Sequence, residues 1–108
     1  MTPRAREMMQ AYAEEMPRSS VVLVRSGAPN CPVRARIVEF NEAEITAGIQ
    51  EGQRKLIVFA PDVTWSEPLR EGDRVQFDGQ DLYVNIVDDQ RRRVDGTLIA
   101  YELRASGL

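Results

Sequence analysis

Arginine is the residue type whose placement in this sequence most clearly suggests chemistry. One uninterrupted run stands near the C-terminus, and two further arginines alternate with apolar residues nearer the N-terminus: Arg91, Arg92 and Arg93, then Arg34 and Arg36. Guanidinium groups hold phosphates by paired hydrogen bonds, so together these side chains could form a basic face that contacts DNA. Arg91, Arg92 and Arg93 are therefore the candidate DNA-proximal residues, and Arg34 and Arg36 join them only in the alternative of a basic face that binds nucleic acid.

The surroundings of the arginine run favour a second interpretation. Asp88, Asp89 and Asp95 flank the run and match its three positive charges. Exposed clusters of mixed charge usually contribute little, so we expect a solvated loop or hairpin end. If 95–96 forms a two-residue turn, residues 91–94 belong to a strand; otherwise residues 88–96 form one loop.

The sequence offers little for catalysis. It contains no histidine, which excludes Ser-His-Asp and Cys-His nucleophiles and histidine metal sites. Cys31 is the only cysteine, and it lies in a turn-rich stretch, 27–32, with nothing nearby to activate it. A small hydrolase using a carboxylate pair would need two acids held apart in a cleft, whereas the adjacent acids at 14–15 and 88–89 look solvated. We expect no enzyme activity, cofactor or metal.

A methionine-rich stripe suggests contact with a protein surface. Thr2 can cap a helix that Pro3 begins and Pro17 ends, and the apolar residues recur at helical spacing: Ala5, Met8, Met9, Tyr12, Ala13 and Met16. The stripe most simply covers the rest of the domain. Methionine also suits surfaces that adapt to partners, so Met8, Met9, Tyr12 and Met16 are candidate contacts.

Trp65 stands in a predicted loop, 61–73, and not in an alternating strand. Exposed tryptophans are frequent in binding hot spots, but a loop tryptophan can equally fold back onto the core. Both interpretations stay open, and Trp65 is a candidate contact.

Six short strands are predicted beyond residue 17. They comprise residues 21–24, a strand from residue 33, and residues 55–60, 75–77, 82–86 and 97–103. In the strand from residue 33 the apolar phase slips near Ile37, which implies a bulge or a strong bend there. The 78–79 pair reads as a tight hairpin turn. The fold class is therefore mainly β: a small antiparallel barrel or sandwich with a short N-terminal amphipathic helix.

A long connection separates two of these strands. Residues 41–53 are acidic, contain two glycines, and carry Ile45 and Ile49 at helical spacing. The segment is expected to be either one turn of helix or a mobile loop, and Ile45 and Ile49 are candidate contacts. The predicted organisation is a single domain of 108 residues, with the helix at 1–17, the barrel at 18–106 and this loop within it.

Charge is unevenly distributed along the chain. The net charge is −3 overall, while residues 1–36 carry six arginines and three glutamates and the remainder is acidic. The overall excess of acidic over basic residues argues against a general nucleic-acid binder.

No apolar run approaches the roughly 20 residues that cross a bilayer, and no secretory leader is recognised. We therefore expect no membrane contact and a reducing cytoplasm.

Three segments resemble a known family. ITAGIQEGQRKLIVFAPD, PLREGDRVQFDGQDLYVNIVDD and RRRVDGTLIAYELRASG are similar to segments of the small head–tail joining proteins of tailed bacteriophages and prophages, also called head-completion, stopper or adaptor proteins. The resemblance covers residues 33–106. It implies a small β-barrel with a long loop that orders on assembly, for which residues 41–53 are the matching segment, and it transfers no individual functional residues.

The resemblance also implies a structural role in the virion. Such proteins form rings below the portal, close the DNA-filled head and offer the tail a docking surface. The expected partners are further copies of this chain, portal or adaptor proteins, and a tail terminator or tail tube protein, with packaged DNA passing close by. The expected location is the neck of the virion, assembled in the bacterial cytoplasm. A small β-barrel that binds nucleic acid through Arg34, Arg36 and the 91–93 run is the alternative.

Overall fold

The N-terminal helix begins and ends where the sequence predicts. The computed structural model describes residues 1–16, 21–38 and 53–107, and its helix α1 spans Pro3–Glu15. The hydroxyl of Thr2 accepts a hydrogen bond from the backbone N–H of Ala5 at 3.1 Å. Met16 has extended backbone geometry and ends the helix, because the residue before a proline disfavours the helical conformation.

The described residues contain nine strands and one short 3-10 helix. In chain order these are β1 Val21–Val24, β2 Cys31–Val33, β3 Ala35–Val38, β4 Gln53–Phe59, η1 Ala60–Asp62, β5 Arg74–Phe77, β6 Gln80–Asp88, β7 Arg93–Val94, β8 Thr97–Leu98 and β9 Ala100–Gly107. Seven of the strands form one antiparallel sheet in the order β2-β1-β5-β6-β9-β4-β3, and β7 and β8 form a separate hairpin.

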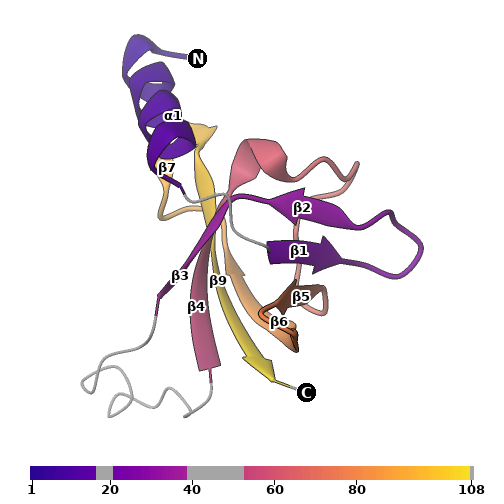
Figure 1. Cartoon of the computed structure of the whole chain (residues 1–108). Helices are drawn as coiled ribbons and strands as arrows, with labels where there is room; N and C mark the ends of the chain where they lie inside the picture. Colours follow the sequence, from indigo (N-terminus) through magenta and orange to yellow (C-terminus); the bar gives the residue numbers. More distant parts are fainter. Residues whose placement is uncertain (17–20, 39–52, 108) are drawn as a thin grey trace.

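The sheet curls into a nearly closed barrel (Figure 1). Its two edge strands, β2 and β3, are separated by Arg34 alone, so they act as one bent strand that pairs with β1 on one half and β4 on the other. The carbonyl of Arg34 accepts a hydrogen bond from the N–H of Phe59 at 3.0 Å, which ties the bend to β4. The predicted fold class, a small antiparallel β-barrel with an N-terminal helix, is confirmed.

Both predicted two-residue turns are present. Asp78 and Asp95 have φ angles of 51° and 49°, and each precedes a glycine that also has positive φ. This left-handed backbone is characteristic of tight hairpins and is tolerated best by Gly, Asn and Asp. The turn at Asp95 joins β7 to β8, so of the two open alternatives the one with a two-residue turn at 95–96 is present. Its strand is shorter than predicted, because only residues 93–94 are strand and residues 91–92 form a turn.

Two predictions about the bent strand were wrong. Cys31 lies in β2 and not in a turn, because the hairpin connection between β1 and β2 ends one residue earlier. The predicted bulge near Ile37 is absent from the described strand: β3 pairs with β4 in unbroken register from Ala35 to Val38. The change of direction falls at Arg34.

The bulge in this barrel is at Asn85 in β6. The register with β9 shifts by one residue between Val84 and Ile86. Because a bulge inserts one extra residue, the side chains after it change faces. Ile86 continues the apolar alternation of Leu82 and Val84 in the sequence, but it is 49% exposed, and Val87 packs inward in its place.

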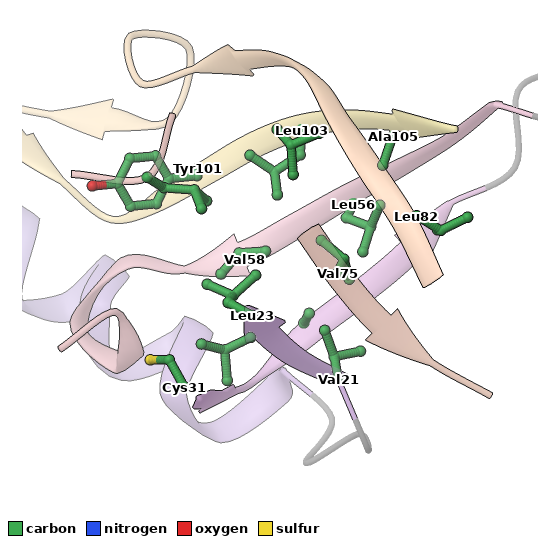
Figure 2. Close-up of a cluster of buried hydrophobic side chains, with 14 residues drawn as sticks. Val21, Leu23, Cys31, Leu56, Val58, Val75, Leu82, Tyr101, Leu103 and Ala105 are labelled. Atoms are coloured by element: carbon green, nitrogen blue, oxygen red, sulfur yellow. The ribbon is translucent and has the colours of Figure 1, made fainter. Parts of the chain in front are cut away.

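The main core fills the barrel from alternate positions of every long strand. Figure 2 shows this cluster, in which Leu56 and Val58 of β4 lie against Tyr101, Leu103 and Ala105 of β9. The β4 strand runs slightly earlier than predicted, and Ala60 belongs to η1. The last predicted strand is divided into β8 and the longer β9.

A second, smaller cluster joins α1 to the outside of the barrel. Buried Met16 meets Ile57, Phe59 and Ala100, whose side chains point away from the main core, and Met9, Tyr12, Ala13 and Val38 pack around them.

Within the described residues, no helix combines the length and apolar character needed to cross a bilayer. Of the predicted loop 41–53, Gln53 belongs to β4 and the rest lies outside the described residues.

Candidate functional site

Strand register places a charged surface beside the α1 cluster. On the outer side of the barrel, one row crosses β3, β4, β9 and β6 through Arg36, Ile57, Glu102 and Asp88. The next row runs through Val38, Lys55, Arg104 and Ile86. Together with Arg91 and Arg92 from the connection after β6, the ionisable side chains of this surface form what we call the charged outer face: Arg36, Lys55, Asp88, Arg91, Arg92, Glu102 and Arg104.

Glu102 is the centre of this face. Its side chain is only 6% exposed, and three cations surround its carboxylate. The distances are 2.8 Å from Oε1 to Nζ of Lys55, 3.8 Å from Oε1 to Nη1 of Arg91, and 3.6 Å from Oε2 to Nε of Arg92. Removing a carboxylate from water is costly unless such charges compensate it, so the cations account for its burial.

The three cations compensate the buried carboxylate of Glu102 by their charge more than by hydrogen bonding. The ammonium of Lys55 is close to Oε1, but not in a hydrogen-bonding direction. Neither carboxylate oxygen of Glu102, nor Nε of Arg92, has a hydrogen-bond partner among the described residues. Buried polar atoms are nearly always satisfied in folded proteins. The carboxylate of Glu102 is therefore balanced by charge, while its hydrogen-bonding capacity stays unfilled by the residues that the structure describes.

The cluster opens to the surface. A depression of about 200 Å³ is lined by Lys55, Ile86, Asp88, Arg91, Glu102, Leu103 and Arg104. Ile86 in this lining is 49% exposed. Tyr83, 46% exposed on the outer side of the same strand β6, lines a different depression. Exposed apolar side chains that border a charged depression are typical of a protein-binding surface.

Asp88 shapes the loop that carries the arginine run. Its Oδ1 accepts hydrogen bonds from the backbone N–H groups of Gln90 and Arg91 at 2.9 and 3.0 Å. These bonds favour the charged carboxylate and lower the pKa of Asp88 below its usual value. The turn that results directs Arg91 back towards Glu102.

The three arginines of the run have different surroundings. Arg91 is exposed beside Glu102, whereas Nη1 of Arg92 donates a 2.7 Å hydrogen bond to the hydroxyl of Tyr12 in α1. Arg93 turns the other way: its Nε donates to the carbonyl of Asp89 and its Nη1 to that of Gly96, bracing the β7–β8 hairpin. The structure thus brings Arg91 and Arg92 to the charged outer face, and Arg93 stabilises a turn.

The other two predicted arginines also separate. Arg34 is held by the carboxylate of Asp62, at 3.0 Å from its Nε, and by the carbonyl of Ala13, and it stacks over Phe59. The guanidinium of Arg34 thus connects the bend between β2 and β3 to η1 and to α1. Arg36 is exposed on the charged outer face, at the edge of a second, smaller depression of about 130 Å³ beneath α1.

Trp65 folds back onto the barrel. Its indole N–H donates a 2.7 Å hydrogen bond to the carbonyl of Pro29, and the guanidinium of Arg25 stacks 4.3 Å from its ring. Arg25 in turn binds buried Asp73 through two hydrogen bonds of 2.7 Å. Of the two interpretations left open, the structure shows the one in which this tryptophan packs against the core.

Most of the methionine-rich stripe of α1 packs against the barrel of the same chain. Met9, Tyr12 and Met16 pack against the barrel, while Met8 points to solvent and is 41% exposed. Ile45 and Ile49, the other candidate contacts, lie outside the described residues.

The described residues bring together no other chemistry. Buried Cys31 contacts the carbonyl of Asp62 through its sulfur at 3.1 Å. No group of three or more Cys, Asp or Glu side chains within 1–16, 21–38 and 53–107 is arranged to hold a metal. What the charged outer face can do is bind an acidic or polar partner by charge and hydrogen bonding.

Sequence reasoning missed Lys55, Glu102 and Arg104. The available signal was Glu102 itself, the one charged residue in IAYEL, a stretch otherwise apolar on both faces. A charged residue in a buried strand implies charged partners, because its burial alone would be too costly. The identity of those partners depends on register, which the sequence does not display.

The chain was compared with known proteins. It matches no family model, no curated protein and no solved structure.

Proposed function

We propose that this chain is a structural subunit that joins the head of a tailed phage or prophage to its tail, assembling with further copies into a ring in the neck. The phage assignment is supported by the resemblance of the three segments between residues 33 and 106. The portal side of the head and a tail terminator or tail tube protein are the proposed neighbours in the virion, without chemical turnover.

The observation that carries a role in assembly is the charged outer face. It surrounds a buried carboxylate whose oxygens accept no hydrogen bond within the described chain, and it borders an open depression. The five cations and two carboxylates of this face leave an excess of positive charge, which an acidic surface on a second protein can balance. Exposed Ile86 and Tyr83 add apolar area to the same side.

The barrel is suited to a building block. Its strands close around one core, with the bent β2–β3 strand joining the two ends of the sheet. A rigid body of this kind can present different surfaces in different directions. Repeated contact between two different surfaces generates a ring when the rotation closes.

The proposal is tested with the purified chain and the portal and tail proteins encoded by neighbouring genes. We expect the chain to form rings visible by electron microscopy, alone at high concentration or on the portal. A chain that stays monomeric under both conditions by sedimentation velocity, and that binds neither protein, would overturn the proposal.

The nucleic-acid alternative is favoured by one observation. Arg36, Arg91 and Arg92 lie on the same outer face as Lys55 and Arg104, which gathers five cations on an otherwise acidic chain. Arg34 and Arg93 are occupied elsewhere. This alternative predicts binding of short DNA that weakens steeply with salt and is lost in Arg91→Ser; no binding at low salt removes it.

A further inference from the structure

A second exposed surface complements the charged outer face. The tight turn between β5 and β6 carries Asp78, and Asp81 follows it at the start of β6; both are exposed. Neither carboxylate forms an ion pair or a side-chain hydrogen bond with the part of the chain that the structure describes. The turn borders a depression of about 460 Å³ whose walls include Val22, Gln76 and Phe77. We call this surface the acidic turn: Val22, Gln76, Phe77, Asp78 and Asp81.

The charges of the two surfaces are opposite. The charged outer face contains five cationic side chains and two carboxylates, Asp88 and Glu102, so positive charge is in excess. The acidic turn contributes two carboxylates and no cation to the lining of its depression. Such complementary surfaces attract one another and are kept from self-pairing by like charge.

Each of the two surfaces also offers apolar groups. Ile86 is half exposed on the outer side of β6, next to the guanidinium of Arg91 and the ammonium of Lys55. The acidic turn offers an open depression with Val22 and Phe77 in its walls. A half-exposed apolar side chain flanked by cations can therefore meet apolar side chains flanked by carboxylates.

We infer that the charged outer face of one copy docks on the acidic turn of a second copy, with Ile86 meeting Val22 and Phe77 and with Asp78 and Asp81 facing Arg91 and Lys55. This inference rests on the proposed function, because it names the two surfaces through which copies of the subunit join.

The positions of the two surfaces require a head-to-tail contact. The charged outer face spans β3, β4, β9 and β6, whereas the acidic turn lies where β1, β5 and the start of β6 meet. The two surfaces therefore occupy different parts of the barrel wall. Because each copy keeps one surface free after docking, the contact propagates from copy to copy and can close into a ring.

Two neutralising variants test the contact without creating new charge pairs. The first, Ile86→Ser with Arg91→Ser, removes the apolar anchor and an exposed cation from the charged outer face. The second, Asp78→Asn with Asp81→Asn, removes the carboxylates of the acidic turn and keeps a residue that tolerates positive φ. Arg6→Ser and Glu71→Gln, exposed residues outside both surfaces, are the matched controls.

Self-association is measured by sedimentation velocity over a concentration series, both alone and with the portal protein. We expect each double variant to self-associate at least about tenfold more weakly than the wild type, and the controls to be unchanged. An equimolar mixture of the two variants retains one intact surface of each kind. It should form 1:1 dimers and nothing larger.

Each other outcome has a definite meaning. Variants that remain folded and self-associate like the wild type would overturn this inference while leaving the proposed function standing. A wild-type chain that never associates, with or without the portal, would overturn both. Loss of short-DNA binding in the first variant alone, with self-association unchanged, would assign the charged outer face to nucleic acid and overturn the inference.

Discussion

Arg92 and Tyr12, which are 80 residues apart in the sequence, are joined by a hydrogen bond of 2.7 Å from guanidinium Nη1 to the phenolic oxygen. The same guanidinium approaches Glu102 through Nε. The N-terminal helix is thus attached to the charged outer face by a polar contact, in addition to its apolar packing on Ile57 and Phe59. A change in the helix can therefore be transmitted to the charges around Glu102.

Removing the hydroxyl of Tyr12 should loosen this attachment. In Tyr12→Phe the apolar ring is retained, but Nη1 of Arg92 loses its acceptor. We expect the free energy of unfolding to fall by about 1 kcal/mol, the typical worth of one such hydrogen bond. Urea denaturation followed by circular dichroism measures the change. Tyr83→Phe, at an exposed position of β6, is the control and should leave the denaturation midpoint unaltered.

The buried pair of Arg25 and Asp73 should be far more important for stability than any exposed pair. Asp73 accepts two hydrogen bonds from Arg25 and one from the N–H of Arg70. In Asp73→Ala the guanidinium is left without its counter-charge in a site that is 10% exposed, so unfolding should become easier by about 3–5 kcal/mol. Thermal denaturation provides the measurement.

The comparison for that prediction is the exposed pair of Glu67 and Arg70, at 2.9 Å. Glu67→Gln should change the stability by less than about 0.5 kcal/mol, because solvent screens such pairs. If Asp73→Ala were as mild as Glu67→Gln, the structural importance of the Arg25–Asp73 pair would be refuted.

Stability at alkaline pH should depend on Tyr101. Burial of its phenol disfavours the phenolate and raises the pKa of Tyr101 above its ordinary value of 10. The folded state therefore binds this proton more tightly than the unfolded chain does. The resulting stabilisation is fully present below about pH 10 and is lost as the pH rises from there through the folded-state pKa.

Urea midpoints of the wild type and of Tyr101→Phe between pH 8 and pH 11.5 isolate this effect. The phenylalanine variant keeps the ring in the core but has no proton to lose, so its stability should fall less steeply above pH 10. Lysine titrates in both proteins and cancels in the comparison. Equal slopes in the two proteins would contradict the prediction.

The bulge at Asn85 gives two nearby apolar residues of β6 very different burial. Val84 is fully buried before the bulge and Ile86 is half exposed after it. Val84→Ala should lower the free energy of unfolding by about 2 kcal/mol, because it leaves a cavity in the core. Ile86→Ala should cost under about 1 kcal/mol although it removes more carbon atoms. Comparable losses, measured by urea denaturation, would place Ile86 in the core and refute the bulge.

Much of the fold could be predicted because it is determined by local chemistry. The limits of α1 follow from a capping threonine and two prolines, and both tight turns follow from Asp-Gly pairs that accept positive φ. Alternation of apolar residues located the strands and, through them, a small β-barrel. These signals act over a few residues, so they can be recognised without knowing the tertiary structure.

The candidate site could be predicted only in part. The arginine run and Arg36 were identified by type, but their roles differ: Arg91 and Arg92 approach Glu102, while Arg93 braces a hairpin and Arg34 supports the bend. Long side chains with several donors bind whichever acceptors the fold brings near. Residue type alone therefore does not separate a structural arginine from one available to a partner.

The sequence by itself determined the helix, the turns, the strand-rich class and the excess of acid over base. Only the tertiary structure decided that Glu102 is buried among Lys55, Arg91 and Arg92, and that Ile86 faces solvent. The physical reason is that strand pairing joins distant segments in a definite register, and a single inserted residue such as Asn85 reverses which side chains face out.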